Sequence, residues 1–92
     1  MKKKIEKTNE FLKIIADPNR LKILVFLKNK PQCVCKIFPM LKISQKLASH
    51  HLTQLKKLKL VKQERNGNFI HYSINKKVLK KYMDILNLTI KI

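Results

Sequence analysis

Two cysteines separated by one residue, Cys33 and Cys35, have the most distinctive chemistry in this chain. Thiolates are soft ligands, suited to As(III), Cd(II), Pb(II), Hg(II), Cu(I) or Zn(II). Lys30 and Lys36 lie nearby in the sequence, and positive charge favours the reactive thiolate. Two cysteines are too few for a disulfide scaffold, and in the cytosol we expect them to be reduced. The pair is a candidate metal site; the alternatives are reversible thiol oxidation and a structural pair of small, partly buried side chains.

Whether the two sulfurs can share one ion depends on the local backbone. In a regular helix, side chains two residues apart diverge by about 200°, and in a strand they share a face but lie several ångströms apart. Pro39 lacks the N–H that would bond the Cys35 carbonyl, and its ring disfavours helical dihedrals at Phe38. We therefore expect an irregular or loosely helical stretch from Cys33 to Phe38, in which the sulfurs are free to converge.

A second set of chemically useful side chains lies on one face of a predicted helix spanning about Ser44 to Leu58. Ser44 is a good N-cap, and the apolar face recurs at spacings of three and four: Ala48, Leu52, Leu55 and Leu58. The opposite face is polar: Gln45, Lys46, Ser49, His50 and Thr53. Such residues can hydrogen-bond base edges in the DNA major groove or phosphates. The alternative is an ordinary solvated helix face.

Further cations and amides lie at the end of this helix and after it. Lys56, Lys57 and Lys59 suit phosphate contacts, because a lysine acts as a point charge; plain surface lysines are the alternative. Arg65 and Asn68 flank a predicted turn and suit an adjacent minor groove or its phosphates. Asn68 is equally typical of the turn itself.

The remaining titratable residues do not suggest catalysis. His50 and His51 are adjacent, so they face different directions and make a poor metal pair, and we expect His71 to be half-buried in a strand. The sequence contains no Ser/His/Asp or Cys/His set, paired carboxylates or glycine-rich phosphate loop, and only 5 acidic residues. We predict that the protein is not an enzyme.

The charge of the chain points to a polyanionic partner. It has 22 Lys plus Arg against 5 Asp plus Glu in 92 residues, a formal net charge of +17. A compact domain with such a field attracts polyanions, of which nucleic acid is the leading candidate and a membrane surface the other. Its length suits a single domain over residues 1–92. The longest apolar run, Ile23 to Leu27, is too short to cross a bilayer, and from Met1 to Lys4 we expect no secretory signal, because no apolar segment follows. We expect a cytoplasmic protein with double-stranded DNA, and no membrane, as its partner.

Three further elements are predicted before the helix from Ser44. An apolar helical stripe covers about Lys4 to Ala16: Ile5, Leu12 and Ile15, with Phe11 beside them. Asp17 caps a second helix that starts at Pro18 and ends near Asn29 to Pro31. Its expected inward residues are Leu21, Leu24, Val25 and Leu27. A third, short element covers Cys35 to Leu41.

The chain after Leu60 predicts a hairpin and a last helix. Val61 to Arg65 and Phe69 to Ile74 flank Asn66-Gly67, a dipeptide typical of a type I′ turn. A final amphipathic helix carries one apolar stripe: Val78, Leu79, Tyr82, Met83, Leu86 and Ile90. The fold class is therefore mainly α with a small β-hairpin, in the order α-α-α-α-β-β-α. This is a winged helix-turn-helix, with Lys42 to Ser44 as the joint and the hairpin as the wing.

An ordered set of segments between Phe11 and Ile74 resembles the ArsR/SmtB repressors. The segments are Ala16 to Leu24, Cys33-Val34-Cys35, Ile43 to Gln45, Ser49 to Leu52, Leu60-Val61 and the Gly67 wing ending in Tyr72-Ser73. The resemblance implies a homodimer whose first and last helices form the interface. It implies release from operator DNA when an inducer, often a metal ion, binds, and it aligns Gln45, Lys46, Ser49 and His50 with groove-facing positions. A two-fold dimer implies an inverted-repeat operator.

The resemblance also implies a soft-metal or As(III) inducer at Cys33 and Cys35, with no cofactor required. The chain departs from the arsenic sensors, which often have a third cysteine where Phe38 stands, and it lacks the N-terminal cysteines of cadmium sensors. A C-terminal zinc site has only Asp84, so a third donor at the thiols would be water, a small thiol or the other subunit. The alternatives are a constitutive DNA-binding regulator without inducer, a thiol-redox-responsive repressor, and a basic protein-interaction or membrane-surface module.

Overall fold

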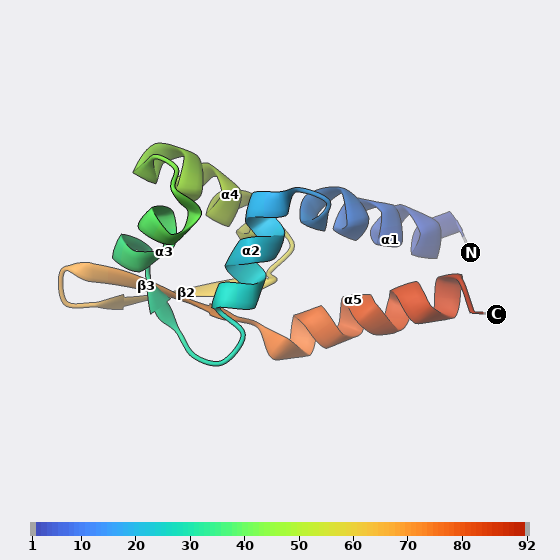
Figure 1. The fold of residues 1–92 in the computed structure, drawn as a ribbon. Helices are drawn as coiled ribbons and strands as arrows, with labels where there is room; N and C mark the ends of the chain where they lie inside the picture. Colours follow the sequence, from blue (N-terminus) through green and yellow to red (C-terminus); the bar gives the residue numbers. More distant parts are fainter. Residues whose placement is uncertain (1, 92) are drawn as a thin grey trace.

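The computed structural model describes residues 2–91, and over that range the chain forms five helices and a small sheet. In order they are α1 (Lys2–Ile15), α2 (Pro18–Phe26), β1 (Gln32–Cys33), α3 (Val34–Leu41), α4 (Gln45–Lys57), β2 (Val61–Asn66), β3 (Phe69–Ile74) and α5 (Lys76–Thr89). This confirms the predicted mainly helical chain with a hairpin and adds the strand β1, which the sequence did not predict. Figure 1 shows α1 and α5 side by side at one end of the molecule and the hairpin at the other.

The start of α2 is fixed by the residue that precedes it. The Asp17 carboxylate accepts hydrogen bonds from the backbone N–H groups of Asn19 at 2.8 Å and Arg20 at 3.2 Å, and Pro18 occupies the first turn, where no N–H is needed. The Arg20 guanidinium donates from Nε to the Ile14 carbonyl at 2.7 Å. Asp17 and Arg20 therefore fix the angle at which the chain passes from α1 to α2.

The inward face of α2 differs from the prediction. Ile23 and Leu27 are buried, whereas Leu21 and Val25 are 46% and 70% exposed. Residues two apart on a helix face different sides, and α2 packs against α1, α3 and α4 through the side that carries Ile23 and Leu27. The prediction that Leu21 and Val25 point inward is wrong.

The third helix also differs from the prediction. It is helical from Val34 and contains Pro39 within it, so the expected irregular stretch from Cys33 to Phe38 is absent. Pro39 removes one hydrogen bond from the helix. Burial of Ile37 and Leu41 in the core offsets that loss.

The sheet is antiparallel, with the strand order β1-β3-β2. Asn66 pairs with Phe69, so the two turn residues are Gly67 and Asn68 rather than the predicted Asn66-Gly67. Of these two, Gly67 has a positive φ of 64° and Asn68 does not. That pattern fits a type II′ turn with glycine at its first central position, not the predicted type I′ turn, which needs positive φ at both.

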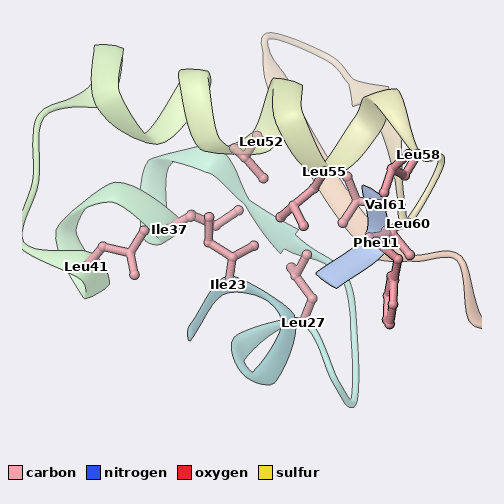
Figure 2. Packing of buried hydrophobic residues seen from close by; sticks show 10 residues of the cluster. All are labelled: Phe11, Ile23, Leu27, Ile37, Leu41, Leu52, Leu55, Leu58, Leu60 and Val61. Carbon is pink, nitrogen blue, oxygen red and sulfur yellow. The ribbon is translucent and has the colours of Figure 1, made fainter. Parts of the chain in front are cut away.

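One hydrophobic core unites the elements. Figure 2 shows its ten clustered side chains: Phe11, Ile23, Leu27, Ile37, Leu41, Leu52, Leu55, Leu58, Leu60 and Val61. The members come from α1, α2 and its C-cap, α3, the second half of α4 and the residues from its end to the start of the wing. The core therefore holds α4 against three other helices and the sheet.

The two terminal helices leave much apolar surface uncovered. Phe11 of α1 is buried and its ring stacks on Tyr82 of α5 with centroids 5.0 Å apart. The α5 residues are half-buried or exposed, and Met83 is 50% exposed. Ile5 and Leu12 of α1 are likewise exposed, so the stripe predicted for α1 is buried mainly at Phe11. Within residues 2–91, no helix has the length and apolar character needed to span a membrane.

Candidate nucleic-acid interface

The helix α4 is anchored along one face and exposed along the other. Ser44 is its N-cap, and the Ser44 hydroxyl accepts a hydrogen bond from the Leu47 N–H at 3.1 Å. Ala48, Leu52 and Leu55 are fully buried, as the spacing predicted. The five residues predicted for the groove are all exposed: Gln45, Lys46, Ser49, His50 and Thr53. The structure thus presents a polar helix face on a rigid support.

The joint before α4 is a tight reversal. Lys42 caps α3 in the left-handed conformation, with φ 58° and ψ 40°. Its N–H donates to the Pro39 carbonyl at 3.0 Å, and the Ile43 N–H donates to the Phe38 carbonyl at 3.3 Å. These bonds satisfy carbonyls at the end of α3 and leave two residues before α4 begins, so α3 and α4 are rigidly connected.

A buried histidine supports α4 from behind, which the sequence did not indicate. His51 is 6% exposed, and its Nδ1 lies 4.0 Å from the Asp17 carboxylate. Burial lowers the pKa of His51, and the Arg20 and His50 charges act in the same direction, whereas Asp17 opposes them. Burial raises the pKa of Asp17, but backbone hydrogen bonds from Arg20 and Asn19 and the nearby charges outweigh it, so that pKa is lowered. His51 is therefore neutral at pH 7, beside an ionised Asp17.

The adjacent histidine has a different environment. His50 is exposed on the outer face of α4 while His51 is buried, in agreement with the prediction that the two face different directions. His71 is half-buried in β3, also as predicted. Within residues 2–91, no three His, Cys, Asp or Glu side chains are grouped so that they could hold a metal ion.

The wing carries exposed polar residues beside α4. Arg65 and Asn68 are exposed, as are Lys57 and Lys59 at the end of α4. Lys56 donates from Nζ to the Gln63 side-chain oxygen at 2.6 Å, which connects α4 to β2. In the described part of the chain, the basic side chains close to a carboxylate are His51, neutral at pH 7 beside Asp17, and Lys80, which pairs with Asp84. The cations of α4 and the wing are therefore not neutralised by carboxylates.

The two cysteines lie between the wing sheet and the joint. Cys33 is buried and extended, with φ −65° and ψ 141°, and it is the N-cap of α3. Cys35 lies in the first turn of α3, exposed, with its Cα 5.1 Å from that of Cys33. The structure joins the two sulfurs in a disulfide, where reduced thiols were expected.

The sulfurs converge for a reason other than the one predicted. They meet because the chain changes from strand to helix at Cys33, so the two residues do not follow the 200° separation of a regular helix. Pro39 does not loosen the helix. Cys33 also pairs with His71 across the sheet, so the cysteine pair connects the wing to the helix that precedes α4.

Comparison with known proteins identifies transcriptional regulators as relatives of this chain. Residues 17–63 match a protein-family model described as bacterial regulatory protein, arsR family. An uncharacterised HTH-type transcriptional regulator from Methanocaldococcus jannaschii is 46% identical over 72 residues, 77% of this chain and 81% of that protein. An arsenical resistance operon repressor from Staphylococcus xylosus is 35% identical over 79 residues, 83% of this chain and 76% of that protein.

The fold has a close match among solved structures. The homodimeric winged helix-turn-helix DNA-binding domain Mb0332 from Mycobacterium bovis, a possible ArsR-family regulator, has a TM-score of 0.74. The alignment covers 92% of this chain and 80% of that one at 24% identity. The predicted winged helix-turn-helix is thereby confirmed, with α3 and α4 as its helix pair and β2–β3 as its wing.

Proposed function

This chain belongs to the ArsR family of transcriptional repressors, DNA-binding regulators rather than enzymes, and we propose that it represses by placing α4 in the major groove of an operator. The observation that carries this proposal is the exposed polar face of α4 on a fully buried apolar one. A helix held this firmly can present side chains to base edges without reorganising.

The proposed contacts fall into two classes. Base or groove contacts come from Gln45, Lys46, Ser49, His50 and Thr53. Glutamine can pair with adenine and lysine with guanine, while serine, threonine and histidine can bond bases or phosphates. Lys56, Arg65 and Asn68 contact the backbone or the adjacent minor groove, because they follow the recognition face along the end of α4 and the wing.

The repressor acts as a homodimer through α1 and α5. Both helices expose large apolar side chains, including Ile5, Leu12, Met83, Leu88 and Ile90, and uncovered apolar surface of this extent marks an interaction site. The related M. bovis domain is homodimeric. Residues 1–92 then form one DNA-binding domain with its dimer interface at the terminal helices, and the operator is an inverted repeat. The site of action is the cytoplasm, where the DNA lies.

The inducer is a soft metal ion or metalloid, such as As(III), bound by Cys33 and Cys35. The S. xylosus relative is an arsenical resistance repressor, and here the chain brings the two sulfurs together in a disulfide; reduction of that bond by a small thiol, itself oxidised to a disulfide, frees both thiolates for one ion. Because Cys33 pairs with the wing and Cys35 lies in the first turn of α3, an ion held by both sulfurs acts on the wing and on the helix that leads into α4. A coupling of about 1–3 kcal/mol is typical of such release. Water, a small thiol or the partner subunit completes the ligand set.

A second regulatory reading is favoured by one observation. The structure holds Cys33 and Cys35 as a disulfide, so oxidation and reduction of the pair is the competing inducing event, with no metal involved. In either case no cofactor is needed for DNA binding itself.

Selection of duplexes from a random pool, followed by gel shifts, tests the function. We expect one inverted-repeat motif, lost in Gln45→Ala and retained in Gln54→Ala, a matched amide on a partly covered side of α4. Recovery of no motif contradicts repression by sequence-specific binding.

The same gel shift, run on the reduced protein with arsenite, cadmium or a mild oxidant, separates the two regulatory readings. Release of the DNA by arsenite or cadmium supports metal induction, and release of the DNA by the oxidant alone supports thiol oxidation as the inducing event. A Cys33→Ser/Cys35→Ser variant that still responds removes the pair from the mechanism. A wild-type complex that responds to nothing identifies a constitutive regulator.

A further inference from the structure

An open groove with a volume of about 740 Å³ lies between the end of α4 and the outer strand of the wing. Four cations line it, Lys56, Lys59, Lys62 and Arg65, together with the amides of Gln63 and Asn75. No carboxylate lines this groove, and within residues 2–91 none of the four cations is part of an ion pair. We shall call it the wing-base groove.

We propose that the wing-base groove binds a stretch of the DNA sugar-phosphate backbone, as a contact independent of sequence and separate from the α4 face. The inference rests on the proposed function, because it presumes that α4 brings the protein to duplex DNA. It adds Lys62 to the binding surface, and it places Lys59, already suited to phosphate contacts by its sequence position, in the same groove.

The charge of the groove is the first argument. Four like charges gathered in one concave surface repel one another and destabilise the free protein. They also focus a positive potential into the groove, where a polyanion would relieve the repulsion. The exposed Lys56–Gln63 hydrogen bond of 2.6 Å joins the two walls of the groove.

The backbone of Lys59 is the second argument. Lys59 has φ 58° and directly follows Leu58, the C-cap of α4. The Lys59 N–H donates to the Lys56 carbonyl at 2.9 Å, and the Leu60 N–H donates to the Leu55 carbonyl at 3.1 Å. Glycine is the residue that ordinarily occupies this position, since it adopts the left-handed conformation without a steric penalty. What distinguishes Lys59 from Lys42, which has the same φ, is that Lys59 lines the groove; lysine therefore places a cationic side chain there that glycine could not provide.

The position of the groove selects the partner. Its walls are the last turn of the recognition helix and the first strand of the wing, so it continues the surface formed by those two elements. Phosphates flank the major groove on both sides, and a helix inside that groove brings its end toward one of them. Duplex DNA therefore fits the groove better than an unrelated anion.

The test measures how duplex affinity depends on salt. The probe is a labelled mixed-sequence duplex of about three helical turns, because a backbone contact needs no operator. Each phosphate contact contributes about 0.9 to the slope of log affinity against log salt. Loss of one contact in Lys59→Gln should lower the slope by that amount. The ratio of the wild-type duplex affinity to the Lys59→Gln duplex affinity should then be about 3.5-fold greater at about 50 mM salt than at about 200 mM.

Matched variants keep the result specific to the groove. Lys59→Arg retains the charge at the same backbone conformation and should bind like the wild type, and Lys62→Gln should repeat the loss. Lys22→Gln on α2 removes one exposed charge outside the groove and should leave the slope unchanged. Lys59→Gly should bind DNA more weakly yet unfold at a higher temperature, an opposition that a misfolded variant cannot produce.

The outcomes separate the two proposals. If the wild type binds no duplex, the proposed function fails and this inference with it. If the wild type binds and Lys59→Gln retains the full slope, as Lys22→Gln does, the wing-base groove is not a backbone site and the proposed function stands. If Lys59→Gln weakens binding to phosphatidylglycerol vesicles while duplex binding is unchanged, the groove serves a membrane surface and the DNA assignment is wrong.

Discussion

Replacing Lys42 by glycine should make the protein more stable. Lys42 holds φ 58° and ψ 40° at the end of α3, a conformation that costs a residue with a Cβ about 1–2 kcal/mol. Its side chain is exposed and belongs to no ion pair in the described part of the chain, so its removal gives up little. Glycine also gives the unfolded chain more conformational freedom, which lowers the free energy of unfolding by roughly 0.4–1 kcal/mol. The net gain should be about 0.5–1 kcal/mol, or about 2–8 °C in melting temperature for a domain of this size.

Urea unfolding followed by circular dichroism measures this gain. Protein concentration must be held fixed, because the stability of a dimer depends on it. Lys42→Ala keeps the Cβ and should unfold like the wild type. Lys36→Gly lies inside α3, where glycine should cost about 1 kcal/mol. The reasoning is refuted if Lys42→Gly unfolds at the same or a lower urea concentration than Lys42→Ala.

Three other perturbations have expected outcomes. Folding lowers the pKa of His51 from its usual 6.5, so the unfolded chain binds that proton more tightly. The free energy of unfolding should therefore fall as the pH drops through about 6.5. A urea series from pH 8 to pH 5 should show that His51→Gln loses this pH dependence. Ser44→Ala removes the N-cap of α4 and should cost about 1 kcal/mol in the same assay; an unchanged midpoint would mean that packing alone holds the first turn. Phe11→Ala should cost about 3–5 kcal/mol, because Phe11 is buried and stacked on Tyr82. A double-mutant cycle on that pair should return about 0.5–1.5 kcal/mol of coupling, and additive effects would contradict the stacking.

The features that local pattern controls were predictable from the sequence. Ala48, Leu52, Leu55 and Leu58 define α4 because each is separated from the next by one helical turn, and all four are buried. The hairpin was predictable from alternating residues around Gly67. Its exact turn was not, because the register between Asn66 and Phe69 depends on how β3 pairs on both of its sides.

Features that depend on contacts distant in sequence were missed. The two-residue strand β1 exists because Gln32 and Cys33 pair with β3, and no pattern that short predicts a strand. Pro39 was expected to break α3, but burial of Ile37 and Leu41 outweighs its local penalty. Tertiary packing overrides local preference in this way throughout proteins.

In the candidate site, too, local pattern was predictable and contacts between distant residues were not. The exposed residues of α4 followed from the apolar stripe opposite them. The approach of His51 to Asp17 joins residues 34 positions apart along the chain, and the wing-base groove needs the left-handed turn at Lys59 to bring β2 beside α4. No regular spacing of residues in the sequence predicts either feature, so both became visible only in the structure.

The position of β2 at the edge of the sheet affects how readily the protein aggregates. The order β1-β3-β2 leaves β2 at an open edge, and its residues after Val61 are exposed. An unpaired edge invites strands from other molecules to add on, and charged side chains along it discourage this. Lys62, Glu64 and Arg65 lie on that edge, so the wing resists the addition of strands from other copies of the protein. Neutralising Lys62 and Arg65 together should therefore shorten the time the purified protein stays clear at high concentration.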